Sequence, residues 1–188
     1  FNDDNKWGTF WSVAGRWNID QESFMEGSAF NMLKLRGSYG LSGNQRVLNA
    51  QYSALFLTRE QYAAGTGYNA TTSTVLSQLP NPNVQWEEIT QTNVGLDFGV
   101  WSNRLNGSLD VYRKVTDQLY QGRPISPVQG SSSINSNIGS MENKGIELTL
   151  NYSFYKDQDW NISASANGSY NKNEIRELPA STNGLVFA

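Results

Sequence analysis

The feature that most constrains this chain is a two-residue alternation that separates its charged side chains from its apolar ones. Successive side chains on a β-strand point to opposite faces, so a period of two predicts strands rather than helices. Six stretches of nine to eleven residues alternate in this way: Trp7–Trp17, Leu33–Gly43, Thr90–Val100, Leu105–Val115, Ile146–Phe154 and Trp160–Tyr170. We therefore expect an all-β fold with six strands, and no helix except a short one at Thr58–Ala64.

Within each stretch, one alternate set of positions holds apolar, aromatic or small residues, and we call it the apolar set; the other is the polar set. The apolar set contains a single charge, Arg113. The polar set contains seven charges: Arg16, Lys34, Arg36, Asp97, Asp110, Lys114 and Glu147. Strands of about 9–11 residues have the length that a tilted strand needs to cross a bilayer. The pattern therefore predicts that the apolar set faces lipid and the polar set faces a wet interior.

The connections between the stretches alternate between short turns and long loops. Trp101–Arg104 and Tyr155–Asp159 are short, whereas Asn44–Ile89 and Thr116–Gly145 are long. Outer-membrane barrels have short turns on the periplasmic side and long loops outside the cell. We therefore assign the short ends to the periplasm and the long ends to the cell exterior.

Aromatic residues mark two levels along the predicted strands. Amphipathic rings prefer the two headgroup levels of a bilayer. Trp17, Trp101, Phe154 and Trp160 lie near the short turns, and Trp7, Tyr39 and Tyr170 lie toward the long loops. Arg113 also falls near a long-loop end, where a lipid-facing cation costs about 0–1 kcal/mol instead of the roughly 2–4 kcal/mol of the midplane.

The composition excludes several classes of protein. The chain contains no cysteine and no histidine, so disulfides, thiolate nucleophiles, histidine-ligated zinc and histidine general bases are excluded. The formal net charge of -3 comes without a basic stripe, so the footprint of a nucleic-acid-binding protein is missing. No run of about 18 apolar residues predicts a membrane-spanning helix.

The acidic residues do not form a catalytic arrangement. Glu87 and Glu88 would face opposite sides of a strand, whereas glycosidase carboxylates must flank one scissile bond. Asp157 and Asp159 lie in a short turn that lacks the glycine and the distant glutamate of an EF-hand loop. We therefore expect no enzymatic activity, no cofactor and no metal site.

Two groups of residues are candidates for contacts with a transported molecule or a partner. Aromatic rings stack on sugars and also pack against proteins, which makes the loop residues Tyr52, Phe56, Tyr62 and Tyr68 candidate cargo or partner contacts. Packing of these rings within the loop is the alternative. The seven charges of the polar set either hold a plug inside a wet lumen through ion pairs and water, or contact cargo directly.

Four groups of motifs follow one another along the chain and cover most of it. They are Trp7–Trp17 with Glu22–Met25; Leu33–Gly40 with Ser42–Gln45; Asn81–Glu87 with Thr92–Gly99, Asn103–Leu105 and Asp110–Asp117; and Asn137–Gly139 with Glu142–Glu147. In this order they resemble the SusC/RagA-like TonB-linked outer-membrane transporters of Gram-negative bacteria.

The resemblance implies an antiparallel transmembrane β-barrel of about 22 strands with a plug in its lumen, of which this chain supplies about six strands. Residues 1–188 would be part of one barrel domain of a longer protein, with the plug and the TonB-contacting segment outside this chain. It also implies an outer-membrane location, surrounding membrane lipid, a SusD-like lipoprotein that caps the barrel, and TonB-driven import of an oligosaccharide or peptide.

Two alternatives stand beside the importer: a passive porin-type barrel and a soluble carbohydrate-binding β-sandwich. A sandwich also has one dry face in each sheet, but its strands average about five or six residues. The assignment of faces predicts that Leu96→Arg impairs barrel assembly. It also predicts that Gly95→Ser, on the polar set, is far milder.

Overall fold

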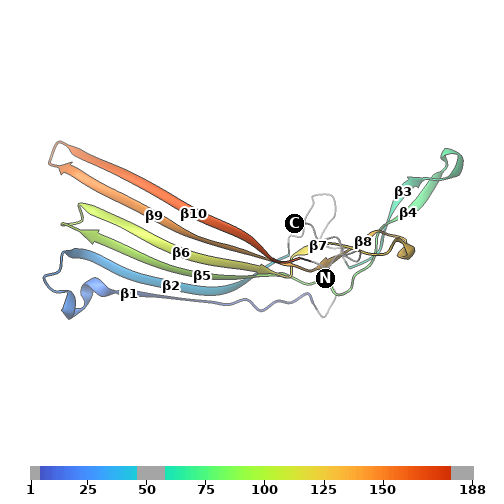
Figure 1. The fold of residues 1–188 in the computed structure, drawn as a ribbon, viewed down its shortest axis with the longest axis horizontal. Coiled ribbons are helices and arrows are strands. Elements are labelled where there is room, and N and C mark those ends of the chain that lie inside the picture. Colours follow the sequence, from blue (N-terminus) through green and yellow to red (C-terminus); the bar gives the residue numbers. More distant parts are fainter. Residues whose placement is uncertain (1–4, 46–57, 179–188) are drawn as a thin grey trace.

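The computed structural model of the chain describes residues 5–45 and 58–178. Six long strands form one antiparallel sheet in the order β1-β2-β5-β6-β9-β10 (Figure 1). They are β1 (Ser12–Asn18), β2 (Phe30–Asn44), β5 (Glu87–Val100), β6 (Leu105–Asp117), β9 (Ser140–Lys156) and β10 (Asn161–Glu177). Each contains or overlaps one of the six predicted stretches, which confirms the all-β antiparallel fold class.

The register of the sheet keeps the two predicted sets apart across all six strands. One cross-strand row consists of Trp17, Leu35, Leu96, Leu109, Leu148 and Gly168. The adjacent row consists of Arg16, Arg36, Gly95, Asp110, Glu147 and Ser169. Residues that lie opposite each other on neighbouring strands share a face. The sheet therefore has one continuous apolar face, carrying the apolar set, and one continuous polar face, carrying the polar set.

The connections lie as the alternation predicted, with the short ones together at one end of the sheet (Figure 1). The β1–β2 connection at that end contains two 3-10 helices, η1 (Ile19–Gln21) and η2 (Ser23–Met25). In the β5–β6 turn, Trp101, Ser102 and Asn103 have φ between 55° and 59°. This left-handed backbone is costly for residues with a Cβ but permits a tight reversal.

The long connections contain two further hairpins at the opposite end of the sheet (Figure 1). Their elements are β3 (Gln61–Thr66), η4 (Tyr68–Ala70), β4 (Thr72–Gln78), β7 (Tyr120–Pro124), η5 (Pro127–Gln129) and β8 (Ser133–Asn137). The helix expected at Thr58–Ala64 is therefore wrong. The backbone there pairs with β4, in a register that sets Tyr62 opposite Leu76. Pairing with a second strand satisfies the backbone groups that an exposed helix turn would leave to water.

The main sheet is a single layer, and within the described residues its apolar face is uncovered from the short turns as far as Arg113, whereas Val115 beyond it is buried. Side chains on that face are exposed to 49% at Val94, 50% at Val111 and 66% at Tyr170. A sandwich would bury such a face against a second sheet about 10 Å away. The soluble alternative is therefore not the arrangement observed, and this face requires an apolar medium of another kind.

The helices within residues 5–45 and 58–178 are all too short or too polar to cross a membrane. Few apolar side chains are fully covered: among the described residues, the buried ones are Val84, Val115 and Tyr120. All three lie at the end of the sheet near the hairpins, where the long connections pack onto the strands. The core formed by the described residues is therefore confined to that end.

Candidate functional site

An arginine centred on the polar face joins three neighbouring strands. The Arg36 guanidinium on β2 donates from Nε to Asp97 Oδ2 on β5 at 3.1 Å. It donates from Nη2 to Asp110 Oδ2 on β6 at 2.8 Å. The three side chains are between 19% and 36% exposed. Charge-assisted hydrogen bonds of this length are among the stronger polar contacts, so three of the seven predicted charges form one ion-pair group.

A glycine creates the space that this ion-pair group occupies. Gly95 lies between Arg36 and Asp110 in the cross-strand row. A Cβ at position 95 would lie 2.6 Å from Arg36 Cζ and 2.7 Å from Asp110 Oδ1. The absence of a side chain lets the guanidinium lie over the β5 backbone. A serine at position 95 would therefore displace Arg36, and the expectation that Gly95→Ser is far milder than Leu96→Arg stays a prediction.

The other four predicted charges lie on the same face without ion pairs. Within residues 5–45 and 58–178, no ion pair forms at Arg16, Lys34, Lys114 or Glu147. Arg16 lies opposite Arg36, and Glu147 lies opposite Asp110. Like charges at opposed positions destabilise a sheet. Arg16 and Glu147 therefore present charge that a molecule on the polar face can neutralise, whereas Lys34 lies opposite Asp97.

A buried carboxylate ties three strands together at the hairpin end of the sheet. Glu87, the first residue of β5, is 8% exposed. Its Oε2 accepts a hydrogen bond from Asn44 Nδ2 at 2.7 Å, at the end of β2. Its Oε1 accepts one from the backbone N–H of Tyr120 at 3.0 Å, at the start of β7. From the sequence, Glu87 is considered only as a member of a rejected catalytic pair, so this structural role is not predicted.

Two asparagines, Asn81 and Asn137, join the segment that precedes β5 to β8. Asn81 Nδ2 donates to the Asn135 carbonyl at 2.8 Å. Asn137 Nδ2 donates to the Gln85 carbonyl at 2.8 Å, and its Oδ1 accepts from the Gln85 backbone N–H at 2.9 Å. Val84, between these contacts, is 0% exposed. The Asn-Pro-Asn-Val-Gln-Trp-Glu motif therefore packs one long connection onto the other.

The candidate loop aromatics are only partly described. Tyr62 on β3 is 60% exposed and Tyr68 in η4 is 95% exposed, so both rings are available on the β3–β4 hairpin. Tyr52 and Phe56 lie outside the described residues. Contact of Tyr62 and Tyr68 with cargo or with a partner protein remains a prediction.

Ring pairs occur at both predicted aromatic levels. Trp11 and Tyr39 have ring centroids 5.4 Å apart toward the long connections. Tyr152 and Phe154 form an edge-on pair at 4.8 Å near the short turns. These are favourable separations for aromatic pairs, and they fit rings at two interfacial levels. No group of three or more acidic metal-ligating side chains occurs within the described ranges.

The sequence and the fold both match one family of known proteins. Residues 1–186 match the family described as TonB dependent receptor-like, beta-barrel. TonB-dependent receptor P39 of Formosa agariphila is 38% identical over 179 residues, which are 95% of this chain and 17% of that protein. TonB-dependent receptor SusC of Bacteroides thetaiotaomicron is 35% identical over 182 residues, 95% of this chain and 18% of that protein.

A solved structure described as the RagAB peptide transporter has a similar fold. It superposes with a TM-score of 0.79 at 32% identity, over 98% of this chain and 20% of that chain. This chain thus spans about a fifth of the length of the relatives that it matches. The matched family consists of receptors and transporters rather than enzymes, in agreement with the expectation of no enzymatic activity. The chain belongs to the TonB-dependent receptor-like β-barrel family.

Proposed function

We propose that this chain forms part of the wall and outer loops of an outer-membrane, TonB-dependent importer of large nutrients. The observation that carries this proposal is the uncovered apolar face, which runs unbroken across six paired strands. Backbone pairing between strands satisfies the polar groups that hydrocarbon cannot. Membership of the receptor barrel family supports the same location and the same class of activity.

The polar face would line the lumen of the complete barrel. Arg36 pairs with both Asp97 and Asp110, which leaves the group one net negative charge, and these ion pairs serve mainly to stiffen the wall. Arg16 and Glu147 are free to pair with groups of a plug or of a passing cargo. We infer that the plug and the TonB-contacting segment belong to other parts of the full-length protein, and that this chain is one portion of a single barrel domain.

The β3–β4 hairpin projects beyond the sheet at the end assigned to the cell exterior (Figure 1). Its exposed rings, Tyr62 and Tyr68, suit contacts with an oligosaccharide or peptide or with a SusD-like lipoprotein. Tyr52 and Phe56 complete the proposed set. The similarity to the RagAB peptide transporter supports a peptide cargo, and the similarity to SusC supports the same transporter class.

Uptake by cells that carry the full-length gene tests this proposal. Fluorescent maltooligosaccharides and a fluorescent tryptic peptide digest serve as the probes, with a deletion strain as the control. We expect uptake of one probe that depends on the gene and stops when the proton-motive force is collapsed. Gene-dependent uptake that survives the collapse would identify a passive porin. A full-length protein that is monodisperse in buffer without detergent would identify a soluble protein.

A further inference from the structure

The apolar face ends, toward the hairpins, in a group of charged side chains on β6, β9 and β10. We call this group the outer charge cluster; it consists of Arg113, Glu142, Lys144, Lys172, Glu174 and Arg176. Strand pairing continues past the apolar positions without a change of face as far as Glu142 and Glu174. The cluster therefore lies on the same side of the sheet as the lipid-facing residues, not on the side of the lumen.

The cations of the cluster lie nearer to the apolar band than the acids do. Arg113, Lys144 and Lys172 occupy one cross-strand row, and Glu142 and Glu174 occupy the next row outward. The row on the other side of the cations consists of Val111, Ile146 and Tyr170. Three positive charges on adjacent strands thus border the band directly.

Glu142 and Glu174 form ion pairs with the cations of the cluster, yet these cations stay about half exposed. Glu142 accepts from Arg113 at 2.7 Å and from Lys144 at 3.2 Å, and only 10% of its side chain is exposed. Lys144 also donates to Glu174 at 2.9 Å, and Lys172 donates to the same carboxylate. The side chains of Arg113, Lys144 and Lys172 remain 53%, 46% and 50% exposed. The nearest further acids on this face, Asp117 and Glu88, lie outward of Glu142 and Glu174, so the charge next to the apolar band is positive.

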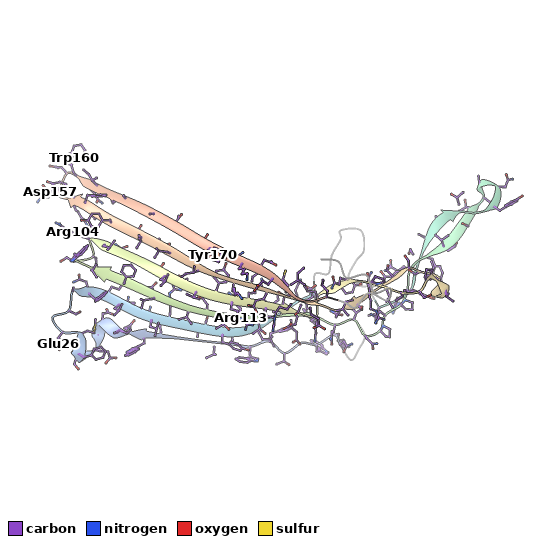
Figure 2. The ribbon with its side chains drawn as sticks, in the orientation of Figure 1. Glu26, Arg104, Arg113, Asp157, Trp160 and Tyr170 are labelled. Carbon is purple, nitrogen blue, oxygen red and sulfur yellow. The ribbon has the colours of Figure 1, made fainter. Side chains whose placement is uncertain are left out.

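The cation row lies at the depth of one membrane interface. From Trp160 to Tyr170, β10 advances about 33 Å along its axis. A tilt of about 40° makes this roughly 25 Å along the membrane normal, which equals the height of the apolar band of such barrels. Figure 2 shows Trp160 at the short-turn end, with Tyr170 and Arg113 toward the hairpins. The cations come directly after Tyr170, at the level of lipid headgroups.

We propose that the outer charge cluster binds the phosphate groups of an anionic lipid in the outer leaflet that surrounds the barrel. This inference rests on the proposed function, because it requires the barrel to lie in the outer membrane. Guanidinium and ammonium groups are strong phosphate donors, and basic pockets at the membrane surface bind lipid headgroups. The adjoining Val111, Ile146 and Tyr170 suit the acyl chains of the same lipid. A cluster that only joined the strands would not need three half-exposed cations in the row that borders the apolar band.

Lipid binding by the full-length protein in detergent, measured by native mass spectrometry, tests the proposal. The probes are bisphosphorylated lipid A and the same lipid after removal of its phosphates. The test variant combines Arg113→Gln, Lys144→Gln and Lys172→Gln. The matched control, Arg16→Gln with Lys34→Gln and Lys114→Gln, removes three cations from the polar face instead.

We expect the test variant to bind lipid A at least tenfold more weakly than the parent, and the control to stay within twofold. Dephosphorylated lipid A should bind weakly to all three proteins. Unchanged binding by the test variant, or an equal loss in the control, would overturn the proposal. Displacement of lipid A by an equal concentration of inorganic phosphate would assign the site to free phosphate and would also overturn it.

A second variant controls for misfolding, because loss of the three cations leaves Glu174 without its two ion-pair partners and leaves Glu142 with Arg176 alone. It adds Glu142→Gln, Glu174→Gln and Arg176→Gln, so that the cluster becomes neutral, and its folding is checked by heat-modifiable migration on gels. We expect the same loss of lipid A binding, and retained binding by this folded variant contradicts the proposal. If the parent shows normal energy-dependent uptake and both variants bind lipid A as strongly as the parent, this inference alone is refuted. If the full-length protein is absent from the outer membrane, the proposed function is refuted.

Discussion

The depth and face of a single leucine allow a quantitative prediction. Leu96 lies in the apolar row between Leu35 and Leu109, four residues from the short-turn end of β5 at Val100. Four residues of a strand tilted by about 40° rise roughly 10 Å along the membrane normal, which is close to the middle of an apolar band about 25 Å high. Leu96→Arg therefore places a cation near the midplane, at a cost of about 2–4 kcal/mol.

That cost corresponds to a shift of roughly 30-fold to 1,000-fold in the folding equilibrium. Two control substitutions separate the effects of depth and face. Thr90→Arg lies on the same face and strand at the outer end, where the cost falls to about 0–1 kcal/mol. Ser108→Arg lies next to Leu109 at almost the same depth but on the polar face, where a cation remains hydrated.

Urea titration of the full-length protein in phospholipid vesicles measures these differences. We expect the free energy of unfolding to fall by about 2–4 kcal/mol for Leu96→Arg and by less than about 1 kcal/mol for the two controls. Equal losses for Leu96→Arg and Ser108→Arg would refute the assignment of faces. Equal losses for Leu96→Arg and Thr90→Arg would refute the assignment of depth.

Three further predictions follow from named contacts. Gly95→Ala should lower stability in urea by about 1–3 kcal/mol because the added methyl displaces Arg36, whereas Gly168→Ala, with nothing within 4 Å, should change it little; equal effects would contradict the role of Gly95. Glu87→Gln should cost about 1–3 kcal/mol through a lost acceptor, and should speed protease cleavage of the long connections; unchanged cleavage would count against the buried carboxylate. Hydrogen bonds from lysines lower the pKa of Glu174, outside the predicted spanning stretch, from 4.5 to about 2. The stabilisation that Glu174→Gln removes should therefore be constant above pH 4.5 and vanish as the pH falls toward 2, which thermal melts across that range will show.

The strands and their faces could be predicted because the alternation is a local property of the sequence. Leu96 and Asp97 are neighbours, and their opposite faces follow from strand geometry without knowledge of the partners. The ends of the strands were harder to predict, because the apolar positions give way to charged residues there. One predicted stretch begins at Ile146 and another stops at Tyr170. In the structure β9 already begins at Ser140, and β10 continues to Glu177. Charged residues outside a membrane do not terminate a paired strand.

The hairpins in the long connections escaped prediction for a related reason. Most side chains of β3 and β4 are exposed on both faces, so the segments carry no apolar stripe that distinguishes a strand from a helix turn. Pairing between the two strands, rather than burial, determines this structure.

The polar groups were predicted as a set, but their partners were not. Arg36 is 61 residues from Asp97 and 74 residues from Asp110 in the sequence. Only the register of β2, β5 and β6 brings them together. Glu87 likewise gains its role from Asn44 and the Tyr120 backbone, which reach it through long connections. Long-range register is the information that a local pattern lacks.

The central claim is that one face of this sheet meets hydrocarbon and the other meets water. Nitroxide labels placed one at a time along β6, from Leu105 to Val115, in the full-length protein in vesicles test it most directly. Collisions with molecular oxygen report hydrocarbon, and collisions with a water-soluble nickel chelate report water. We expect the two accessibilities to alternate with a period of two and in opposite phase, with oxygen highest at Leu109 and the chelate highest at Ser108. Accessibilities that rise and fall together, or that show no alternation, would contradict the account.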